Sequence, residues 1–280
     1  MEDGKIFVMV NGLSPDKGKM ARAVAEKVLD APDMHLYRGS LTGEDVDAEE
    51  VVVISPNNCA NIPLFKPSNR YEVFHANALP YISVDFTHPS AVNENADFYC
   101  NHKLNFVMGT TGGDRKALEE RVKNSEICAV IAPNMAKQIV AFQSMVKNAA
   151  ETSPNAFKGY KLQIVESHQN GKADTSGTAK AMVEYFNKLG IPYSVKDIQM
   201  IRDPETQLKM GVPEEALGGH GWHTYILGSE DGSVSFKFTH NVNGREVYAN
   251  GTMDAIRFLD KKIKAGEKGK VYSMMDVLKG

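Results

Sequence analysis

Short apolar runs alternate with helical periodicity through the first half of the chain. An apolar run at residues 6–10 leads through a glycine-containing turn into apolar positions at helical spacing over residues 20–29. Further strands are predicted at residues 51–54, 81–84, 105–108 and 127–131, and helices at 90–100 and 115–123. This alternation is typical of a parallel sheet flanked by helices. Residues 57–77 are rich in Asn and Pro, lack periodicity and are predicted to be irregular.

After Pro133 the pattern changes. Residues 135–150 form a long helical pattern, with Ile139, Phe142, Met145 and Val146 on one face. A strand is predicted at residues 160–165, a helix at 178–189, strands at 195–202, 223–227 and 234–239, and a final helix at 250–259. The fold class is therefore α/β, with an N-terminal Rossmann-like domain and a C-terminal α+β domain that has a mixed, mostly antiparallel sheet. We expect the first domain to cover residues 1–133, with 246–280 returning to it, and the second to cover 134–245.

Composition narrows the possible partners. The formal net charge is -3, so no global basic field favours nucleic acid as a partner. No apolar run reaches the ~20 residues of a membrane span, so a soluble protein with no membrane contact is predicted. The three cysteines form no CxxC pair, which fits a reducing compartment, and each is predicted to be a small buried residue. The N-terminal residues resemble neither a secretory nor a transit segment, which favours the cytoplasm, or the plastid stroma if a transit peptide has been removed.

The turn after the first strand carries the first candidate chemistry. Gly12 and Gly18 lie where a dinucleotide site needs backbone N–H groups near the pyrophosphate at a helix N-terminus. The spacing is not GxGxxG, and Ala21 stands where a third glycine would allow close helix packing. An ordinary strand–helix loop explains these residues about equally well, and only their position after the first strand favours a cofactor.

The end of the second strand selects the cofactor in such folds. A carboxylate there binds the ribose hydroxyls of NAD, whereas an arginine accommodates the 2′-phosphate of NADP. This chain offers Arg38 and Ser40, and no carboxylate before Glu44. The prediction is NADPH, with NADH possible; the alternative is that Arg38 is a solvated surface residue.

The segment from Glu166 to Ala179, ESHQNGKADTSGTA, combines two kinds of chemistry. His168 and Lys172 lie in a polar loop after a strand, where titratable groups can face a cleft. Ser176, Gly177 and Thr178 then open a helix, whose free N–H groups suit a carboxylate or phosphate. For any one residue an ordinary role is more probable: Asp174 or Thr175 as the N-cap, His168 as a satisfied loop histidine, Lys172 as a solvated charge. The whole cluster favours function.

These residues resemble the H-x-x-x-K-x-D…SGTA signature of the 4-hydroxy-tetrahydrodipicolinate reductase family. The absence of proline before Ser-Gly-Thr is similar to the plant-type branch. Four further segments agree over nearly the whole chain: the GTTG loop after Met108, the DFT-x-P strand end at Asp85, APNM at Ala132 and the C-terminal MDVL.

The resemblance implies roles residue by residue. His168 would be the proton donor/acceptor and Lys172 the proton donor in the NAD(P)H-dependent reduction of a cyclic hydroxy-imine dicarboxylate, on the lysine pathway. Substrate contacts are implied for Thr111, Gln169, Ser176, Gly177 and Thr178. Cofactor contacts are implied for Gly12, Gly18, Lys19, Met20, Arg38, Phe86, Thr87, Gly109, Thr110, Thr111, Ala132, Pro133, Asn134 and Met135. No metal is implied, and the second domain would bind substrate and form a homo-oligomer, a dimer or tetramer.

The chain departs from the family pattern at two places. Gln169 stands where many members carry a second histidine, and Gln can hydrogen-bond a carboxylate but cannot carry charge. The glycine loop, residues 13–17, is longer than usual. Arg245 receives no role. Two alternatives stay open: another NAD(P)H-dependent reductase of a small cyclic or keto acid on the same fold, and a catalytically silent binding homologue.

Overall fold

The computed structural model describes residues 4–75 and 82–280, which fall into two compact units. Unit 1 is Met1–Lys137 with Tyr248–Gly280, and unit 2 is Gln138–Val247. The expected boundaries lie at 133/134 and 245/246, whereas those of the structure lie at 137/138 and 247/248.

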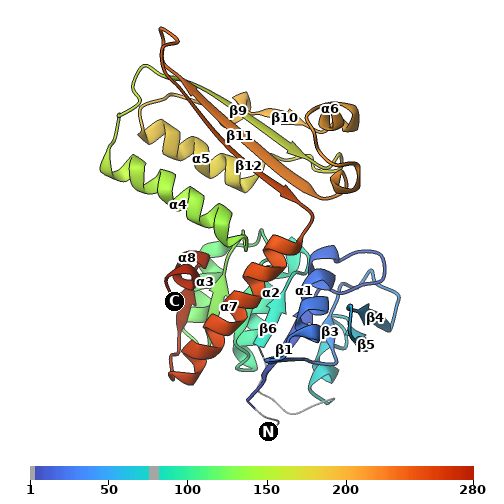
Figure 1. Ribbon diagram of the computed structural model, residues 1–280. Helices are drawn as coiled ribbons and strands as arrows, with labels where there is room; N and C mark the ends of the chain where they lie inside the picture. The colour runs from blue at the N-terminus through green and yellow to red at the C-terminus, as the bar shows by residue number, and fades with distance from the viewer. Residues whose placement is uncertain (1–3, 76–81) are drawn as a thin grey trace. The chain divides into compact units, whose positions relative to one another are not determined.

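Unit 1 is built on a six-stranded parallel sheet with the strand order β13-β8-β7-β6-β1-β2 (Figure 1). Its strands are β1 (Ile6–Asn11), β2 (Met34–Leu36), β6 (Ile82–Asp85), β7 (Phe106–Met108), β8 (Cys128–Ile131) and β13 (Lys270–Tyr272). The predicted strand at 81–84 begins at a residue outside the described ones. Neither β13 nor the short helix after it was predicted, because a three-residue strand near the C-terminus has too little periodicity to stand out.

Helices cover both faces of this sheet. They are α1 (Lys19–Asp30), α2 (Val92–Asn101), α3 (Arg115–Lys123), α7 (Glu246–Lys264) and α8 (Met274–Lys279), with a 3-10 turn at Pro89–Ala91. Helix α1 buries Ala21, Val24, Ala25 and Val28, one face of an amphipathic helix. Asp114 caps α3 by accepting from the Ala117 N–H.

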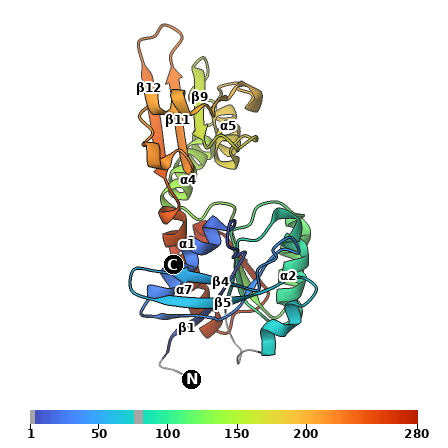
Figure 2. The ribbon, with the colours of Figure 1, turned by 90° about the vertical axis from the view of Figure 1, so that its right-hand side faces the viewer.

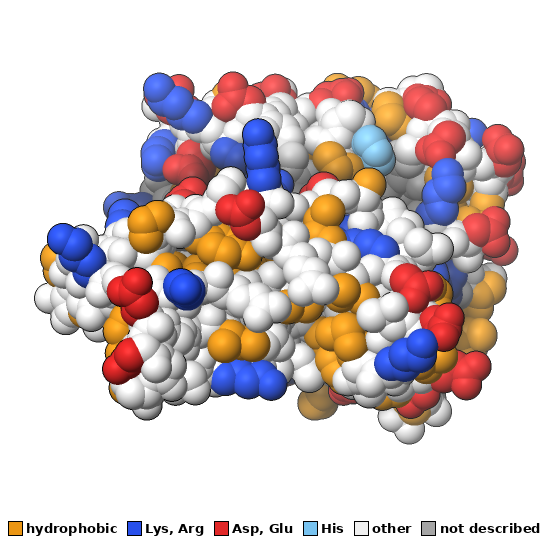
Figure 3. Space-filling model, turned by 90° about the horizontal axis from the view of Figure 1, so that it is seen from above, with side chains coloured by type: hydrophobic (Ala, Val, Ile, Leu, Met, Phe, Trp, Pro, Cys, Tyr) orange, Lys and Arg blue, Asp and Glu red, His pale blue; other side chains and the backbone are white. Residues whose placement is uncertain are grey.

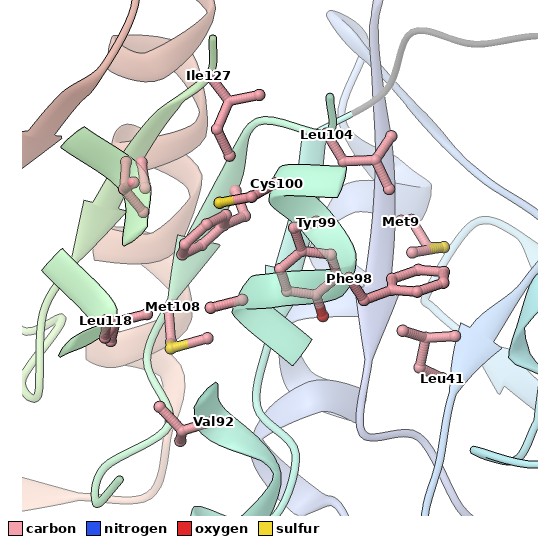
Figure 4. Packing of buried hydrophobic residues seen from close by; sticks show 14 of the residues in the cluster. Met9, Leu41, Val92, Phe98, Tyr99, Cys100, Leu104, Met108, Leu118 and Ile127 are labelled. Carbon is pink, nitrogen blue, oxygen red and sulfur yellow. The ribbon is translucent and has the colours of Figure 1, made fainter. Parts of the chain in front are cut away.

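The core between the sheet and α2 and α3 is rich in aromatic and sulfur-containing side chains. Tyr99 lies fully buried beside Phe98, and Met108 and Leu118 approach from β7 and α3 (Figure 4). Because successive strand residues face opposite ways, Met9 belongs to this core while Val8 and Val10 face the other side.

The predicted strand at residues 51–54 is confirmed. The prediction of an irregular region at residues 57–77 was wrong, because part of it belongs to a small accessory sheet. This sheet has the order β3-β5-β4, with β3 at Ser40–Leu41, β4 at Glu50–Ile54 and β5 at Cys59–Phe65, and a 3-10 helix follows at Arg70–His75 (Figure 2). Pro63 sits in β5, where its missing N–H obscured the strand signal. Cys59 is exposed here, contrary to the prediction, whereas Cys100 and Cys128 are buried.

Unit 2 is a four-stranded sheet covered on one face by two helices. The strand order is β10-β9-β11-β12, with β9 parallel to β10 and antiparallel to β11, so the sheet is mixed and mostly antiparallel as predicted. Its elements are α4 (Lys137–Thr152), β9 (Lys161–His168), α5 (Gly177–Lys188), β10 (Gln199–Ile201), α6 (Pro204–Lys209), β11 (His220–Gly228) and β12 (Ser235–Asn243), with 3-10 turns at Val195–Asp197 and Glu214–Ala216.

One predicted strand in unit 2 was wrong in extent, and one helix was missed. The predicted strand at 195–202 is a strand only over Gln199–Ile201, because Ser194 and Asp197 form a capping box that bends its first part into a 3-10 turn. Helix α6 was not predicted. The core joins α4 and α5 to the sheet through Val146, Phe186 and Tyr225.

The surface mixes both signs of charge. Lys and Arg side chains are interspersed with Asp and Glu over the face shown in Figure 3. None of the helices in the described ranges is long and apolar enough to cross a membrane.

Candidate functional site

The polar segment begins at the end of β9. Because side chains alternate along a strand, Glu166 and His168 share the face on which Ile164 packs under the helices. In the pairing with β11, Glu166 lies opposite His223 and His168 lies opposite Gly221. The register therefore brings His223 beside both functional candidates on β9.

Glu166 is fully buried and anchors the loop that follows it. Its Oε1 accepts from Nη2 of Arg202 at 2.5 Å, and its Oε2 accepts from the Ser176 N–H at 3.0 Å. The Nε of Arg202 also donates to the carbonyl of Lys172 at 2.7 Å. A buried carboxylate is stable only when it is paired and hydrogen-bonded. The pair thus ties β9, the loop and the start of α5 into one arrangement.

Lys172 projects from this loop. Its Nζ donates to Oδ1 of Asp174 at 2.6 Å. The side chain of Lys172 is 22% exposed and that of Asp174 is 73% exposed. An incoming carboxylate can replace such an exposed partner at little cost, since exposed ion pairs contribute ~0–1 kcal/mol. The Lys172 ammonium group is thus positioned by Asp174 and can exchange this carboxylate for one on a ligand.

Helix α5 begins beside the loop that carries Lys172. Ser176, and not Asp174 or Thr175, is its N-cap: its Oγ accepts from the Thr178 N–H at 3.2 Å. A Cβ on Gly177 would meet no atom within 4 Å. The protein's own packing does not demand glycine there, so the small residue leaves room for a ligand at the positive end of the helix.

Both ring nitrogens of His168 lie within hydrogen-bonding distance of a partner. Nδ1 lies 3.1 Å from the carbonyl oxygen of His220, and Nε2 lies 3.1 Å from Nε2 of His223. Burial, together with the charges of Arg202 and Lys172, lowers the pKa of His168 to about 4, although the Glu166 carboxylate opposes this shift. The imidazole is therefore neutral at neutral pH. Gln169 is half-buried next to it, and its carbonyl accepts from the Lys172 N–H.

Glu166, His168 and His223 also form a group that could be considered for a metal ion, with donor atoms within 4.8 Å of one another. Both carboxylate oxygens of Glu166 are already bound, one by a guanidinium. The positive charges of Arg202 and Lys172 next to the group oppose a second cation. The contacts favour the ion pair over a metal.

The second set of candidates lies in unit 1, at the carboxyl edge of its parallel sheet. There the loops after β1, β6, β7 and β8 meet, as ligand-binding loops do in such sheets. Asp85, buried at the end of β6, holds them together. It accepts from Thr87 Oγ1 at 2.8 Å, from Tyr99 Oη at 2.7 Å and from Thr110 Oγ1 at 2.6 Å. The hydroxyls of Thr87 and Thr110 thus bind Asp85 and stabilise the loops, whereas Thr111 is exposed.

Glycine is required at three positions on this edge. Gly12 and Gly18 have φ values of 96° and 67°, which L side chains rarely adopt. A Cβ on Gly109 would lie 2.2 Å from the ring of Phe86. The loops after β6 and β7 can approach each other only without that atom. Lys19 and Met20 form the first turn of α1, beside Gly18.

The segment Ala132–Met135 is partly turned inward. Ala132 and Met135 are buried, whereas Pro133 is exposed and Asn134 is half-buried. A Cβ on Gly251 of α7 would lie only 1.7 Å from the Met135 carbonyl oxygen. Any contact with a nicotinamide therefore depends on Pro133, Asn134 or the backbone.

Arg38 and Ser40 differ in their exposure to solvent. Arg38 is exposed directly after β2. Ser40 is fully buried, and its Oγ is engaged with the Leu13 N–H and the Leu41 carbonyl. Of the two, only Arg38 is placed to meet a ligand phosphate.

Several residues that organise these sites carry no signal in the sequence. Arg202, His223 and Gly251 each lie far along the chain from the groups they support, at 36, 55 and 116 residues from Glu166, His168 and Met135. Arg245 places its guanidinium against Gly219 within unit 2. Only the fold brings these residues to their partners.

Comparison with known proteins gives the same result for both units. The family described as "Dihydrodipicolinate reductase, N-terminus" matches residues 6–135, and "Dihydrodipicolinate reductase, C-terminus" matches residues 138–278. Arabidopsis thaliana 4-hydroxy-tetrahydrodipicolinate reductase 1, chloroplastic, is 46% identical over 275 residues, covering 98% of this chain and 78% of the relative. The reductase of Synechocystis sp. is 28% identical over 289 residues, covering 98% of each chain.

A solved structure has the same fold. Dipicolinate-bound dihydrodipicolinate reductase from Paenisporosarcina sp. TG-14 matches with a TM-score of 0.64 at 20% identity, covering 97% of this chain and 99% of that one. At this identity the likeness concerns the fold alone.

Proposed function

The chain belongs to the dihydrodipicolinate reductase family, and on that premise we propose that it reduces 4-hydroxy-tetrahydrodipicolinate to tetrahydrodipicolinate with NAD(P)H, in the diaminopimelate route to lysine. One observation carries the proposal. A lysine ammonium, a neutral histidine and an open helix terminus are fixed around one loop by the buried Glu166–Arg202 pair.

The proposed division of labour follows from these contacts. The reaction adds a hydride and a proton to the substrate and releases water. The bound nicotinamide supplies the hydride. Lys172 supplies the proton, because its ammonium is held at the loop and its partner Asp174 is exposed. His168 is neutral in the free protein, so we assign it a proton-accepting role beside Lys172.

The substrate carboxylates are assigned to the start of α5. The Gly177 N–H and the hydroxyls of Ser176 and Thr178 lie at the positive end of a 12-residue helix, whereas the N–H groups of Ser176 and Thr178 are engaged by Glu166 and by the Ser176 Oγ. Gln169 adds an uncharged hydrogen-bonding group, and Thr111 is also proposed as a substrate-binding residue. The cofactor is assigned to the edge of unit 1, with its pyrophosphate at Gly12, Gly18, Lys19 and Met20, where the glycines permit close approach of a phosphate.

An activity assay tests this function directly. The full-length protein should oxidise NADPH when the substrate is generated in situ by the preceding synthase, and should not do so when the synthase is omitted. Oxidation with another small cyclic or keto acid, but not with this substrate, would favour a different reductase. If neither NADPH nor NADH is oxidised with any of these substrates, the protein is a catalytically silent binding homologue.

NADPH is the proposed preferred cofactor, and Arg38 is its proposed determinant. Arg38→Ala should raise KM for NADPH by about tenfold, the scale of one lost charge-assisted hydrogen bond, and leave KM for NADH within about twofold. Steady-state kinetics with each cofactor measure the difference. Arg22→Ala is the matched control, because that exposed guanidinium is occupied by the Val52 carbonyl. Equal effects on NADPH and NADH would remove Arg38 from this role.

The location and the oligomeric state of the protein are two further proposals. The Arabidopsis and rice proteins are named as chloroplastic, which supports a plastid location for this chain. A homo-oligomer is proposed to form through unit 2, where β12 has an unpaired edge and exposes Phe236. Light scattering after size exclusion measures the state.

A further inference from the structure

The hydrogen bonds of His168 define which of its nitrogens carries the proton. The His220 carbonyl can only accept, so Nδ1 of His168 must donate to it and carries the hydrogen. Since the ring is neutral, its Nε2 is a bare acceptor. The neighbouring Nε2 of His223, 3.1 Å away, must then be the donor.

The same logic extends one residue further. His223 is 3% exposed and neutral, because burial lowers its pKa well below the usual range. With its proton on Nε2, its Nδ1 accepts from the hydroxyl of Tyr225 at 3.1 Å. Burial raises the pKa of Tyr225, which keeps that hydroxyl protonated as the chain of donors requires. The hydrogen bonds therefore run from Tyr225 to His223 to His168 to the His220 carbonyl. The Nδ1–H form of His168 is stabilised at both nitrogens, by the carbonyl that accepts from Nδ1 and by the His223 N–H that donates to Nε2.

We propose that His223 is a positioning residue for the reaction: through its Nε2–H it holds His168 as the Nδ1–H tautomer, and Tyr225 in turn orients His223. The proposal rests on the proposed function, in which His168 acts beside Lys172. Replacing a group that orients a functional histidine commonly lowers activity about 10–100-fold.

The two histidine rings that contact His223 allow a positioning role to be distinguished from simple packing. His240 stacks on the His223 ring, with centroids 4.7 Å apart and planes at 25°, but no hydrogen bond joins them. His168 instead meets His223 at a right angle, through nitrogens. A packing role predicts that His240 and His223 matter alike for His168, whereas a positioning role predicts that only His223 matters.

The first test reads the tautomer without substrate. Long-range 1H–15N NMR spectra of the labelled full-length protein should show His168 with a protonated Nδ1 and a bare Nε2. His223→Leu should shift this pattern towards the Nε2–H form or a mixture. His240→Phe keeps a stacked ring without nitrogens and should leave the His168 resonances unchanged. A wild-type His168 protonated at Nε2, or a pattern that His223→Leu does not change, overturns the proposal.

The second test reads turnover. His223→Leu should lower kcat by about 10–100-fold and change the substrate KM by less than about threefold. His223→Gln retains an N–H towards His168 and an acceptor for Tyr225, and should recover kcat to within about fivefold of wild type. A His223→Gln variant as slow as His223→Leu would contradict positioning by hydrogen bonding.

Tyr225→Phe covers the case in which His223→Leu does not fold. It removes only the hydroxyl and keeps the ring that packs on Phe186. It should move the Nδ1 resonance of His223 and lower kcat; unchanged resonances and kcat overturn the proposal. If the protein lacks the proposed reductase activity, the NMR experiment still decides the tautomer, so the two failures are distinguishable.

Discussion

Replacing Lys172 with alanine is expected to lower kcat by about 10²–10⁴-fold, the usual cost of losing a positioned general acid. The reason is local. The Lys172 ammonium is held by the 2.6 Å contact with Asp174, and His168 is neutral with a pKa of about 4. No other cationic group in the 166–179 segment itself is available to give the proton, and Arg202 is engaged by Glu166. Steady-state kinetics with the synthase-coupled assay measure the loss.

The control for this prediction is Lys209→Ala. That lysine also sits in an ion pair, with Glu205 at 2.6 Å, but on the exposed surface of α6. Its loss should leave kcat within about twofold, since exposed pairs contribute little. The cofactor KM should be unchanged in both variants, because Lys172 is assigned to the substrate. Turnover of Lys172→Ala near that of Lys209→Ala would eliminate it as the proton donor.

Breaking the Glu166–Arg202 pair is expected to have the largest effect on stability. Glu166→Gln keeps the shape but leaves the Arg202 guanidinium, which is only 16% exposed, without a countercharge. The amide also presents an N–H to one of the two donors that Glu166 now accepts from. Losing one partner of a buried pair costs about 3–5 kcal/mol in the free energy of unfolding. Urea unfolding followed by circular dichroism measures it.

The effect should extend to substrate binding. Because the Ser176 N–H donates to Glu166, the variant should also loosen the start of α5 and raise the substrate KM. Glu205→Gln is the matched control: it removes the exposed pair with Lys209 and should cost less than about 0.5 kcal/mol. A Glu166→Gln protein as stable as Glu205→Gln would show that the buried pair does not hold the loop.

Elements stabilised by neighbouring residues could be predicted from the sequence, whereas contacts between residues distant in the sequence could not. The helix over residues 115–123 was predicted with its observed ends, because Asp114 caps it within the local sequence. The sequence correctly placed the start of α5 at Ser176, Gly177 and Thr178, and the alternative N-cap at Asp174 or Thr175 was wrong. The hydrogen bond from the Ser176 N–H to Glu166, ten residues earlier, could not be predicted. Strand β5 was missed because its pairing partner β4, and not its own periodicity, stabilises it.

The fold class, the α/β order of unit 1 and the ordered family motifs between Asp85 and Leu278 could all be predicted from the sequence alone. Local patterns and short-range spacing carry that information. The contacts that hold the site together depend on the folded chain. Glu166 meets Arg202 across 36 residues, and His168 meets His223 across 55. Strand register, a non-local property, sets both contacts. The segment supplies the reacting groups, and the sheet decides their orientation and protonation.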